Sequence, residues 1–255
     1  MKRLTMLLTV LLTTGQGWAA PTQTTLRVFC SGGMYPVIES LKSDYLQQTG
    51  TQIELEAAPS MGKTPQAIPN RLARQDNADV LVMVDYAIKP LENDRLVRAQ
   101  SHKVLAHSWI AMAVRKGVTP PDISNVQKFK QVLTESDSIA ISDSASGRYI
   151  KSEMLTKLGL GDKTAKKVVV IPATPVGKAV ADGKAAIGFQ QNSELKAVKG
   201  ITIVGLIPQT VQQDTLYGAV VTQSSSQPQK AGEFIHYLNS DKARAMMKEK
   251  GLTPF

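Results

Sequence analysis

The chain has 255 residues, of which 42% are hydrophobic and one, Cys30, is cysteine, and its formal net charge at pH 7 is +9. This length allows one large domain or two small ones, and the single cysteine excludes an internal disulfide. The charge does not predict nucleic-acid binding, because Lys and Arg are scattered and aromatic residues are only 5%; it predicts a modest field that attracts anions.

The first 19 residues are predicted to be a secretory signal peptide. Lys2 and Arg3 precede an apolar run over residues 4–12, and small residues lead to a cleavage site that we place after Ala19. The run is shorter than the ~20 residues that span a membrane. We therefore expect a soluble exported protein, and the style of the signal peptide together with the lack of disulfides favours a bacterial periplasm.

The next part of the chain alternates strand-like and helix-like patterns. Residues 25–29 and 52–57 are predicted strands, separated by a helix over residues 37–49 that stops at Gly50. A short helix over residues 68–75 precedes residues 78–84, ADVLVMV, a continuous apolar run that is typical of a buried parallel strand.

The second half repeats this alternation without a sequence repeat of fixed period. Strands are predicted over residues 108–114, 138–142, 167–171, 185–189 and 215–222. Helices are predicted over residues 126–133, 149–159 and 176–183, followed by one long amphipathic helix over residues 229–248. The alternation indicates an α/β protein with parallel sheets that helices cover on both faces.

No low-complexity linker divides the chain, so we expect two lobes joined by crossing strands. We place the first lobe at residues 20–105 and 215–255, and the second at residues 106–214. The C-terminal helix would then return to the first lobe.

Four turns rich in small polar residues follow predicted strands or precede predicted helices. They are FCSGGM (29–34), APSMGKTP (58–65), SDSASGR (142–148) and PATPVGK (172–178). In open α/β sheets, ligands bind beyond the carboxyl ends of strands, where helix N-termini present free N–H groups. Each turn alone is explained as well by ordinary capping. Together, the four predict an anion held between two lobes.

Ser31, SMGKTPQAIPNRLARQDNADVLVM (60–83) and ISDSASGRY (141–149) resemble the molybdate-binding-like branch of type II periplasmic binding proteins. The resemblance extends over essentially the whole chain after the signal peptide. It implies the type II fold, with two α/β lobes, two crossing strands and a ligand cleft between the lobes. It also implies hydroxyl ligands at Ser31 and Ser60 and backbone donors around Ala145 and residues 173–176.

The predicted ligand-binding residues come from both lobes. They are Ser31, Gly32, Ser60, Lys63, Ser144, Ala145, Ser146, Arg148, Pro175, Val176 and Gln191. True molybdate binders have a tyrosine where this chain has Gln191. Lys63, Arg148 and Lys178 add cations in or beside the ligand turns, which favours a di- or tricarboxylate over a compact oxyanion. The alternative interpretation of Arg148 is a solvent-facing residue in the first turn of a helix.

The same family contains aconitate isomerases, so the resemblance implies an interconversion of cis- and trans-aconitate. This 1,3-proton shift requires one acid/base and donors to the carboxylates, with no metal or organic cofactor. Lys63, in a ligand turn, and His107, at the start of a predicted crossing strand, are the candidate acid/base residues. A structural hydrogen bond is the commoner role for a lone histidine there. The chain has no nucleophile elbow, paired metal ligands or P-loop.

Two functions therefore stay open from the sequence. The first is an aconitate isomerase on a binding-protein fold, which the cations in the turns and the missing tyrosine favour. The second is a receptor that delivers a carboxylate or a molybdate-like oxyanion to an ABC importer, and such a receptor would need the same cations. The fold cannot choose between them, because function belongs to the site. In either case we expect a monomer with a small anionic ligand and no nucleic-acid partner.

Overall fold

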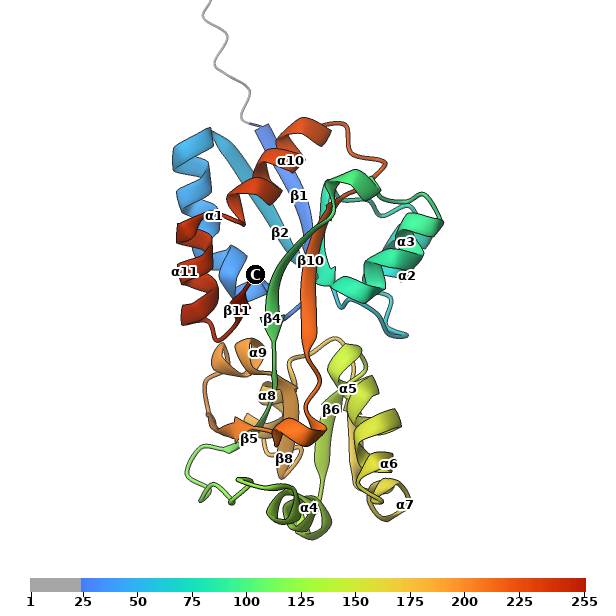
Figure 1. Cartoon of the computed structure of the whole chain (residues 1–255), viewed down its shortest axis with the longest axis vertical. Helices are drawn as coiled ribbons and strands as arrows, with labels where there is room; N and C mark the ends of the chain where they lie inside the picture. The colour runs from blue at the N-terminus through green and yellow to red at the C-terminus, as the bar shows by residue number, and fades with distance from the viewer. Residues whose placement is uncertain (1–23) are drawn as a thin grey trace, which may run out of the picture.

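The computed structural model describes residues 24–255, so the predicted signal peptide lies outside the described residues. Figure 1 shows two α/β lobes stacked along the long axis, with β4 and β10 running side by side toward the second lobe. Within the described range, no helix is both long enough and apolar enough to cross a membrane. The two-lobed α/β architecture confirms the predicted fold class.

The first lobe contains a six-stranded sheet in the order β11-β4-β10-β3-β1-β2. Its strands are β1 (Thr24–Cys30), β2 (Thr51–Ala57), β3 (Val80–Val84), β4 (Lys103–Ser108), β10 (Thr215–Val221) and β11 (Thr253–Pro254). β1 is parallel to β2 and β3, whereas β10 is antiparallel to β3 and β4. The prediction of parallel sheets is therefore wrong in part, because the strand that returns from the second lobe enters this sheet in the opposite direction.

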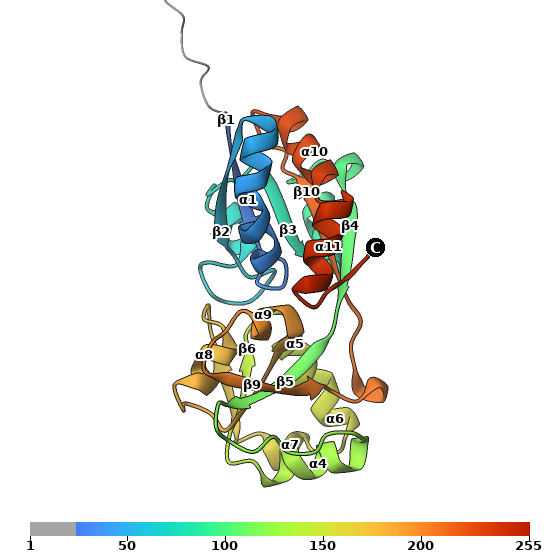
Figure 2. The same ribbon diagram turned by 90° about the vertical axis from the view of Figure 1, so that its left-hand side faces the viewer.

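The helices of this lobe flank the sheet, as Figure 2 shows from the side of α1. They are α1 (Tyr35–Thr49), α2 (Ile68–Ala73), α3 (Ile88–Asn93), α10 (Pro228–Tyr237) and α11 (Asp241–Glu249), with 3₁₀ turns at Asp85–Ala87 and Ala99–Ser101. Gly50 ends α1, as predicted, with φ of 70°. The single helix predicted over residues 229–248 is wrong: Ser240 starts a new helix by accepting a hydrogen bond from the Ala243 N–H at 3.3 Å.

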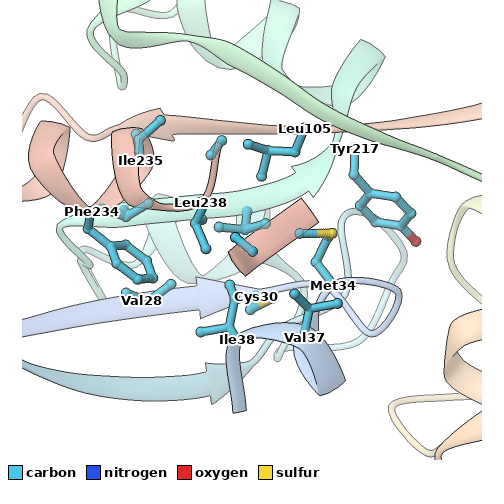
Figure 3. Close-up of a cluster of buried hydrophobic side chains, with 14 of the residues drawn as sticks. Val28, Cys30, Met34, Val37, Ile38, Leu105, Tyr217, Phe234, Ile235 and Leu238 are labelled. Carbon is cyan, nitrogen blue, oxygen red and sulfur yellow. The ribbon is translucent and has the colours of Figure 1, made fainter. Parts of the chain in front are cut away.

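The core of the first lobe is an apolar cluster between the sheet and three of these helices, α1, α10 and α11. Figure 3 shows part of it, including Val28 from β1, Ile38 from α1 and Phe234 from α10. Cys30 ends β1 and is buried in this cluster, where it packs as a small apolar residue. Tyr217 lies at the edge of the cluster, with its hydroxyl pointing away from the other labelled side chains.

The second lobe contains a five-stranded sheet in the order β7-β6-β8-β5-β9. Its strands are β5 (Ile110–Arg115), β6 (Ile139–Ser142), β7 (Val168–Ile171), β8 (Ile187–Gln191) and β9 (Ile201–Leu206). β6 is parallel to β7 and β8, whereas β5 is antiparallel to β8 and β9. The sequence patterns did not predict β9, although its residues, ITIVGL, are strand formers.

The helices of the second lobe are short. They are α4 (Val126–Glu135), α5 (Ala145–Tyr149), a π-helical segment (Ile150–Met154), α6 (Leu155–Lys157), α7 (Gly161–Thr164), α8 (Val176–Ala181) and α9 (Asn192–Lys196), with a 3₁₀ turn at Gln209–Val211. The helix predicted from Tyr149 begins at Ala145, so the Ser-rich turn is itself the start of the helix. β8 extends to Gln191, beyond the predicted strand end at residue 189, so Gln191 belongs to the strand.

The chain passes from one sheet to the other at a single residue. β4 of the first sheet ends at Ser108 and β5 of the second begins at Ile110, so Trp109 divides the strand predicted over residues 108–114. The chain returns between Val211 and Thr215. The predicted lobe boundaries, 105/106 and 214/215, stay a prediction.

Candidate functional site

A cleft of about 150 Å³ lies between the two lobes, beside the turns that follow β1, β2, β6 and β7. The first lobe lines it with Ser31, Ala57, Pro59, Gln66, Val84 and Tyr217; the second contributes Ser142, Asp143, Ser144, Ala145, Ser146, Ile171, Ala173, Thr174, Pro175, Gln190, Gln191 and Glu194. Sites for drug-sized ligands have volumes of about 300–1,000 Å³, so this cleft suits a smaller molecule.

Six of the predicted ligand-binding residues line the cleft, and their role in binding stays a prediction. They are Ser31, Ser144, Ala145, Ser146, Pro175 and Gln191. Three others adjoin it without lining it. Ser60 is buried and its Oγ accepts a hydrogen bond from the Val84 N–H at 2.9 Å, while the Val176 N–H donates to Oε1 of Gln190 at 2.8 Å. Gly32 lies beneath the side chain of Glu194.

The predicted cations lie outside the cleft lining. Lys63 and Arg148 are exposed, and Lys178 is exposed and pairs with Asp182 at 3.3 Å. The residues that line the cleft include no Lys, Arg or His. The turns face the cleft with backbone and small side chains, whereas the long charged side chains remain in water, where they keep their hydration. The expected cation-rich site is therefore corrected to one of hydroxyl, amide and backbone donors.

Gln191 connects the two chain crossings. Its Oε1 accepts a hydrogen bond from the Ser108 hydroxyl at 2.7 Å, and its Nε2 donates to Oγ1 of Thr215 at 3.1 Å. The amide is 1% exposed, so both of its polar groups serve the hinge between the lobes. Gln191 is thus a buried hydrogen-bonded link between the two chain crossings at the hinge.

His107 also lies at the hinge, outside the cleft lining. Its Nδ1 is hydrogen-bonded to the Asp214 carboxylate at 2.8 Å, which joins the two crossings. Its ring stacks on Phe255 with centroids 5.5 Å apart and an interplanar angle of 17°. These contacts give His107 the structural role that the sequence left open as the alternative to catalysis.

Glu194 is a cleft residue that sequence reasoning missed. It lies on α9, lines the cleft, and one of its carboxyl oxygens accepts a hydrogen bond from Nε2 of Gln190. Burial raises its pKa from 4.5 to about 8, and the hydrogen bond from Gln190 only partly opposes this shift. The available signal was an acidic residue just after the cleft end of a strand, in QQNSELK, but the first turn of any helix favours such a residue.

Glu194 reaches across the cleft to the first lobe. A Cβ placed on Gly32 would lie 2.3 Å from Oε2 of Glu194, so the turn after β1 accepts this carboxyl group only because residue 32 is glycine. Beside it, the Tyr217 hydroxyl lies against the same turn, 2.3 Å from the place of a Cβ on Gly33. Burial, followed by the charge of Glu194, raises the pKa of Tyr217 well above 10.

A second close approach joins the lobes through Gly62 and Asp143. A Cβ on Gly62, whose φ is 125°, would lie 3.0 Å from both the carbonyl oxygen and Oδ2 of Asp143. On the second-lobe wall, Ala173 has φ of 52°, a left-handed conformation that costs on the order of 1 kcal/mol in a non-glycine residue. The structure therefore has its lobes in contact around the cleft, with a strained turn in the wall.

We expect Glu194 to make the free energy of unfolding fall as the pH rises from 5 to 8. The folded state holds this carboxyl protonated up to about pH 8, whereas the unfolded chain ionises it near 4.5, so the folded state binds more protons in this window. The stabilisation from this carboxyl is complete below pH 4.5 and is lost as the pH approaches about 8. We expect urea unfolding to show that the free energy of unfolding falls by roughly 1–3 kcal/mol less between pH 5 and 8 in Glu194→Gln than in the wild type. Equal pH slopes in both proteins would contradict the raised pKa.

In residues 24–255, no group of three or more His, Cys, Asp or Glu side chains is placed to hold a metal ion. The polar groups that line the cleft are hydroxyl groups, amides and backbone N–H groups at the start of α5, a donor set that can bind an anion.

Comparisons with known proteins extend over nearly the whole described chain. A family model described as bacterial extracellular solute-binding protein matches residues 26–253. An aconitate isomerase from a Pseudomonas species is 47% identical over 236 residues, which are 92% of this chain and 90% of that protein. A putative ABC transporter substrate-binding lipoprotein of Bacillus subtilis is 24% identical over 193 residues, 73% of this chain and 72% of the relative. Among solved structures, the periplasmic molybdate-binding protein of Azotobacter vinelandii has a TM-score of 0.72 at 22% identity, over 89% of this chain and 98% of that one.

Proposed function

The chain belongs to the bacterial extracellular solute-binding protein family, and we propose that it interconverts cis- and trans-aconitate as a cofactor-independent isomerase. The family match and the molybdate-binding neighbour confirm the resemblance recognised in the sequence. The observation that carries the activity is the 47% identity to an aconitate isomerase over 92% of the chain. The groups that line the cleft give the proposed activity a physical basis.

The cleft can hold carboxylates without cations. Ser31 of one lobe and Ser144, Ser146 and Thr174 of the other present hydroxyl groups, and α5 begins at the cleft with Ala145. A hydrogen bond from a neutral donor to an ionised carboxylate is worth about 1.5–3 kcal/mol, so several such donors replace the salt bridges that the sequence suggested. The formal charge of +9 on the whole chain adds a long-range attraction for anions.

The same donors suit the reaction. Aconitate carries a methylene group next to its double bond, and removal of a methylene proton leaves an anion that spreads over the allylic carbons and the attached carboxylates. Return of a proton to the opposite allylic carbon moves the double bond and allows either geometry in the product. Fixed hydrogen-bond donors around the carboxylates stabilise this developing charge in a cleft that is partly closed to water.

The setting that we infer is the periplasm, which fits an extracellular solute-binding family and the predicted signal peptide over residues 1–19. The second candidate function is a receptor for an ABC importer of a carboxylate or oxyanion. Its support is the 24% identity to a putative ABC transporter substrate-binding lipoprotein. A receptor needs only binding and lobe closure, whereas an isomerase also needs a proton carrier in the cleft.

The test is to incubate the protein, produced from residue 20 onward, with trans-aconitate in deuterated water and to follow the substrate by proton NMR. We expect catalytic formation of cis-aconitate, slowed by tricarballylate, which has the same carboxylates but no double bond. Saturable binding of trans-aconitate without any conversion would identify a receptor and overturn the isomerase. If the protein binds only molybdate, both the isomerase and a carboxylate receptor are wrong.

A further inference from the structure

We propose that Glu194 is the catalytic residue that carries the proton in this 1,3-shift, an inference that rests on the proposed isomerase activity. Its carboxylate would take a proton from the methylene carbon and return it to the opposite end of the allylic system. One residue would thus act first as the base and then as the acid.

The cleft offers few other groups for this role. Only Asp143, Glu194 and Tyr217 among its lining residues carry titratable side chains. Tyr217 has a pKa raised well above 10, so its phenol is not a base near neutral pH. Asp143 has its Oδ2 directed at the turn that contains Gly62, 3.0 Å from the place of a Cβ there. Glu194 is therefore the strongest candidate that the geometry leaves.

The carboxyl group of Glu194 is held in place by a short chain of hydrogen bonds. Nε2 of Gln190 donates to Oε2 of Glu194, and Oε1 of Gln190 accepts from the Val176 N–H at 2.8 Å, at the start of α8. Gln190 is 5% exposed, so its orientation is fixed. In the described part of the chain, the only side-chain hydrogen bond to the Glu194 carboxyl comes from Gln190. This bond uses Oε2, so Oε1 is left to carry the proton.

The position of Glu194 suits a bound polycarboxylate. Its carboxyl lies over Gly32, in the turn whose Ser31 hydroxyl lines the same cleft. A carboxylate of the ligand held by Ser31 would therefore bring the adjoining carbon close to Glu194. Since the residue comes from the second lobe and the turn from the first, the proton carrier and this ligand donor meet only when the lobes are together.

The raised pKa of about 8 supports this role, because it makes Glu194 a far stronger base than an exposed glutamate. In the first step, the O–H bond of Glu194 forms as the methylene C–H bond breaks, and the electron pair delocalises onto the substrate. In the second step, this O–H bond breaks as a C–H bond forms at the opposite allylic carbon. Glu194 is then ionised again, and no other reactant is consumed.

The groups that face Glu194 should not obscure its titration. On the first lobe they are the Cys30 thiol and the Tyr217 phenol, and burial raises the pKa of each well above its ordinary value. On α9 itself, Lys196 turns outward and donates to the Glu249 carbonyl at 3.2 Å. From α1, Tyr35 and Glu39 line the outer groove beside Lys196, separate from the cleft.

The experiment compares the wild-type protein with Glu194→Gln, Asp143→Asn and, as a control, Glu135→Gln. Gln keeps the volume of Glu194 and can still accept the hydrogen bond from Gln190, while Glu135 is exposed on α4, away from the cleft. The measurements are turnover of trans-aconitate, deuterium exchange into its methylene group, and calorimetric binding of tricarballylate. The pH profile of wild-type kcat/KM is the fourth measurement.

We expect Glu194→Gln to lower kcat by about 100- to 10,000-fold, the usual contribution of a general acid/base, and to abolish methylene exchange. Tricarballylate should still bind within about tenfold of the wild-type affinity, and Glu135→Gln should behave as wild type. Wild-type kcat/KM should rise about tenfold per pH unit below pH 8 and level off above it, because the base form of Glu194 is required.

The outcomes separate the inference from the proposed function. An inactive wild-type protein would overturn the isomerase itself. If the wild type is active and Glu194→Gln keeps more than a tenth of its kcat, the role of Glu194 is overturned and the isomerase stands. The same holds if Asp143→Asn is the variant that loses methylene exchange. Loss of tricarballylate binding in Glu194→Gln, in parallel with the loss of turnover, would make Glu194 a binding residue and also overturn the proposal.

Discussion

Gly147→Ala should destabilise the protein by roughly 2–4 kcal/mol, although alanine is the better helix former by ~1 kcal/mol. Gly147 lies in the first turn of α5, and a Cβ there would be 1.8 Å from the carbonyl oxygen of Ser142 and 2.7 Å from its carbonyl carbon. Ser142 ends β6, which lies between β7 and β8, so this backbone cannot move aside. The steric conflict therefore outweighs the gain in helix propensity.

The matched control is Gly232→Ala. Gly232 also lies in a helix, α10, but a Cβ there would meet no atom within 4 Å, so this change should be neutral or stabilising by up to ~1 kcal/mol. Urea unfolding of both variants measures the difference directly. Binding of trans-aconitate to Gly147→Ala should weaken as well, since Ser144 and Ser146, which line the cleft, belong to the displaced turn. A Gly147→Ala protein as stable as wild type would contradict this account of the turn.

The sequence predicted the cleft turns better than the residues around them, and Gly147 illustrates the reason. Small hydroxyl residues and glycines between a strand and a helix are visible in SDSASGR because the requirement for them is local. The same locality let the strand β6 and the Gly50 stop of α1 be predicted, since each depends on neighbouring residues. The start of α5 at Ala145 was missed because serine and glycine are poor helix formers.

Charge was the least reliable guide to the site. Lys63 and Arg148 lie in ligand turns by sequence, yet adjacent residues of a turn point in different directions, and both side chains remain exposed. Glu194 is the opposite case, because a five-residue helix on the second lobe gave no pattern of its own. Its importance depends on Gly32, 162 positions earlier, and on the meeting of two lobes, which no local pattern encodes. The contact between these two residues across the lobes is thus the part of the site that the sequence could not predict.

Gly32→Ala should leave both lobes folded but lower kcat/KM by about 100-fold or more, the effect of displacing a catalytic group by about 1 Å. The new Cβ would lie 2.3 Å from Oε2 of Glu194 and 2.7 Å from its Cδ. These atoms end a flexible side chain, so either Glu194 leaves its place or the lobes stay apart. Neither response disturbs a hydrophobic core, and we expect the free energy of unfolding to change by less than ~1 kcal/mol.

Two measurements distinguish these responses. In a protein that begins at residue 20, Trp109 at the hinge is the single tryptophan, so its fluorescence should report lobe closure on addition of tricarballylate. Small-angle X-ray scattering gives an independent measure of the same closure. If Gly32→Ala holds the lobes apart, the double variant Gly32→Ala/Glu194→Ala should regain closure without regaining turnover, because the space is restored and the proton carrier is absent. Wild-type turnover in Gly32→Ala would show that the contact between residue 32 and Glu194 is not needed in the catalytic state.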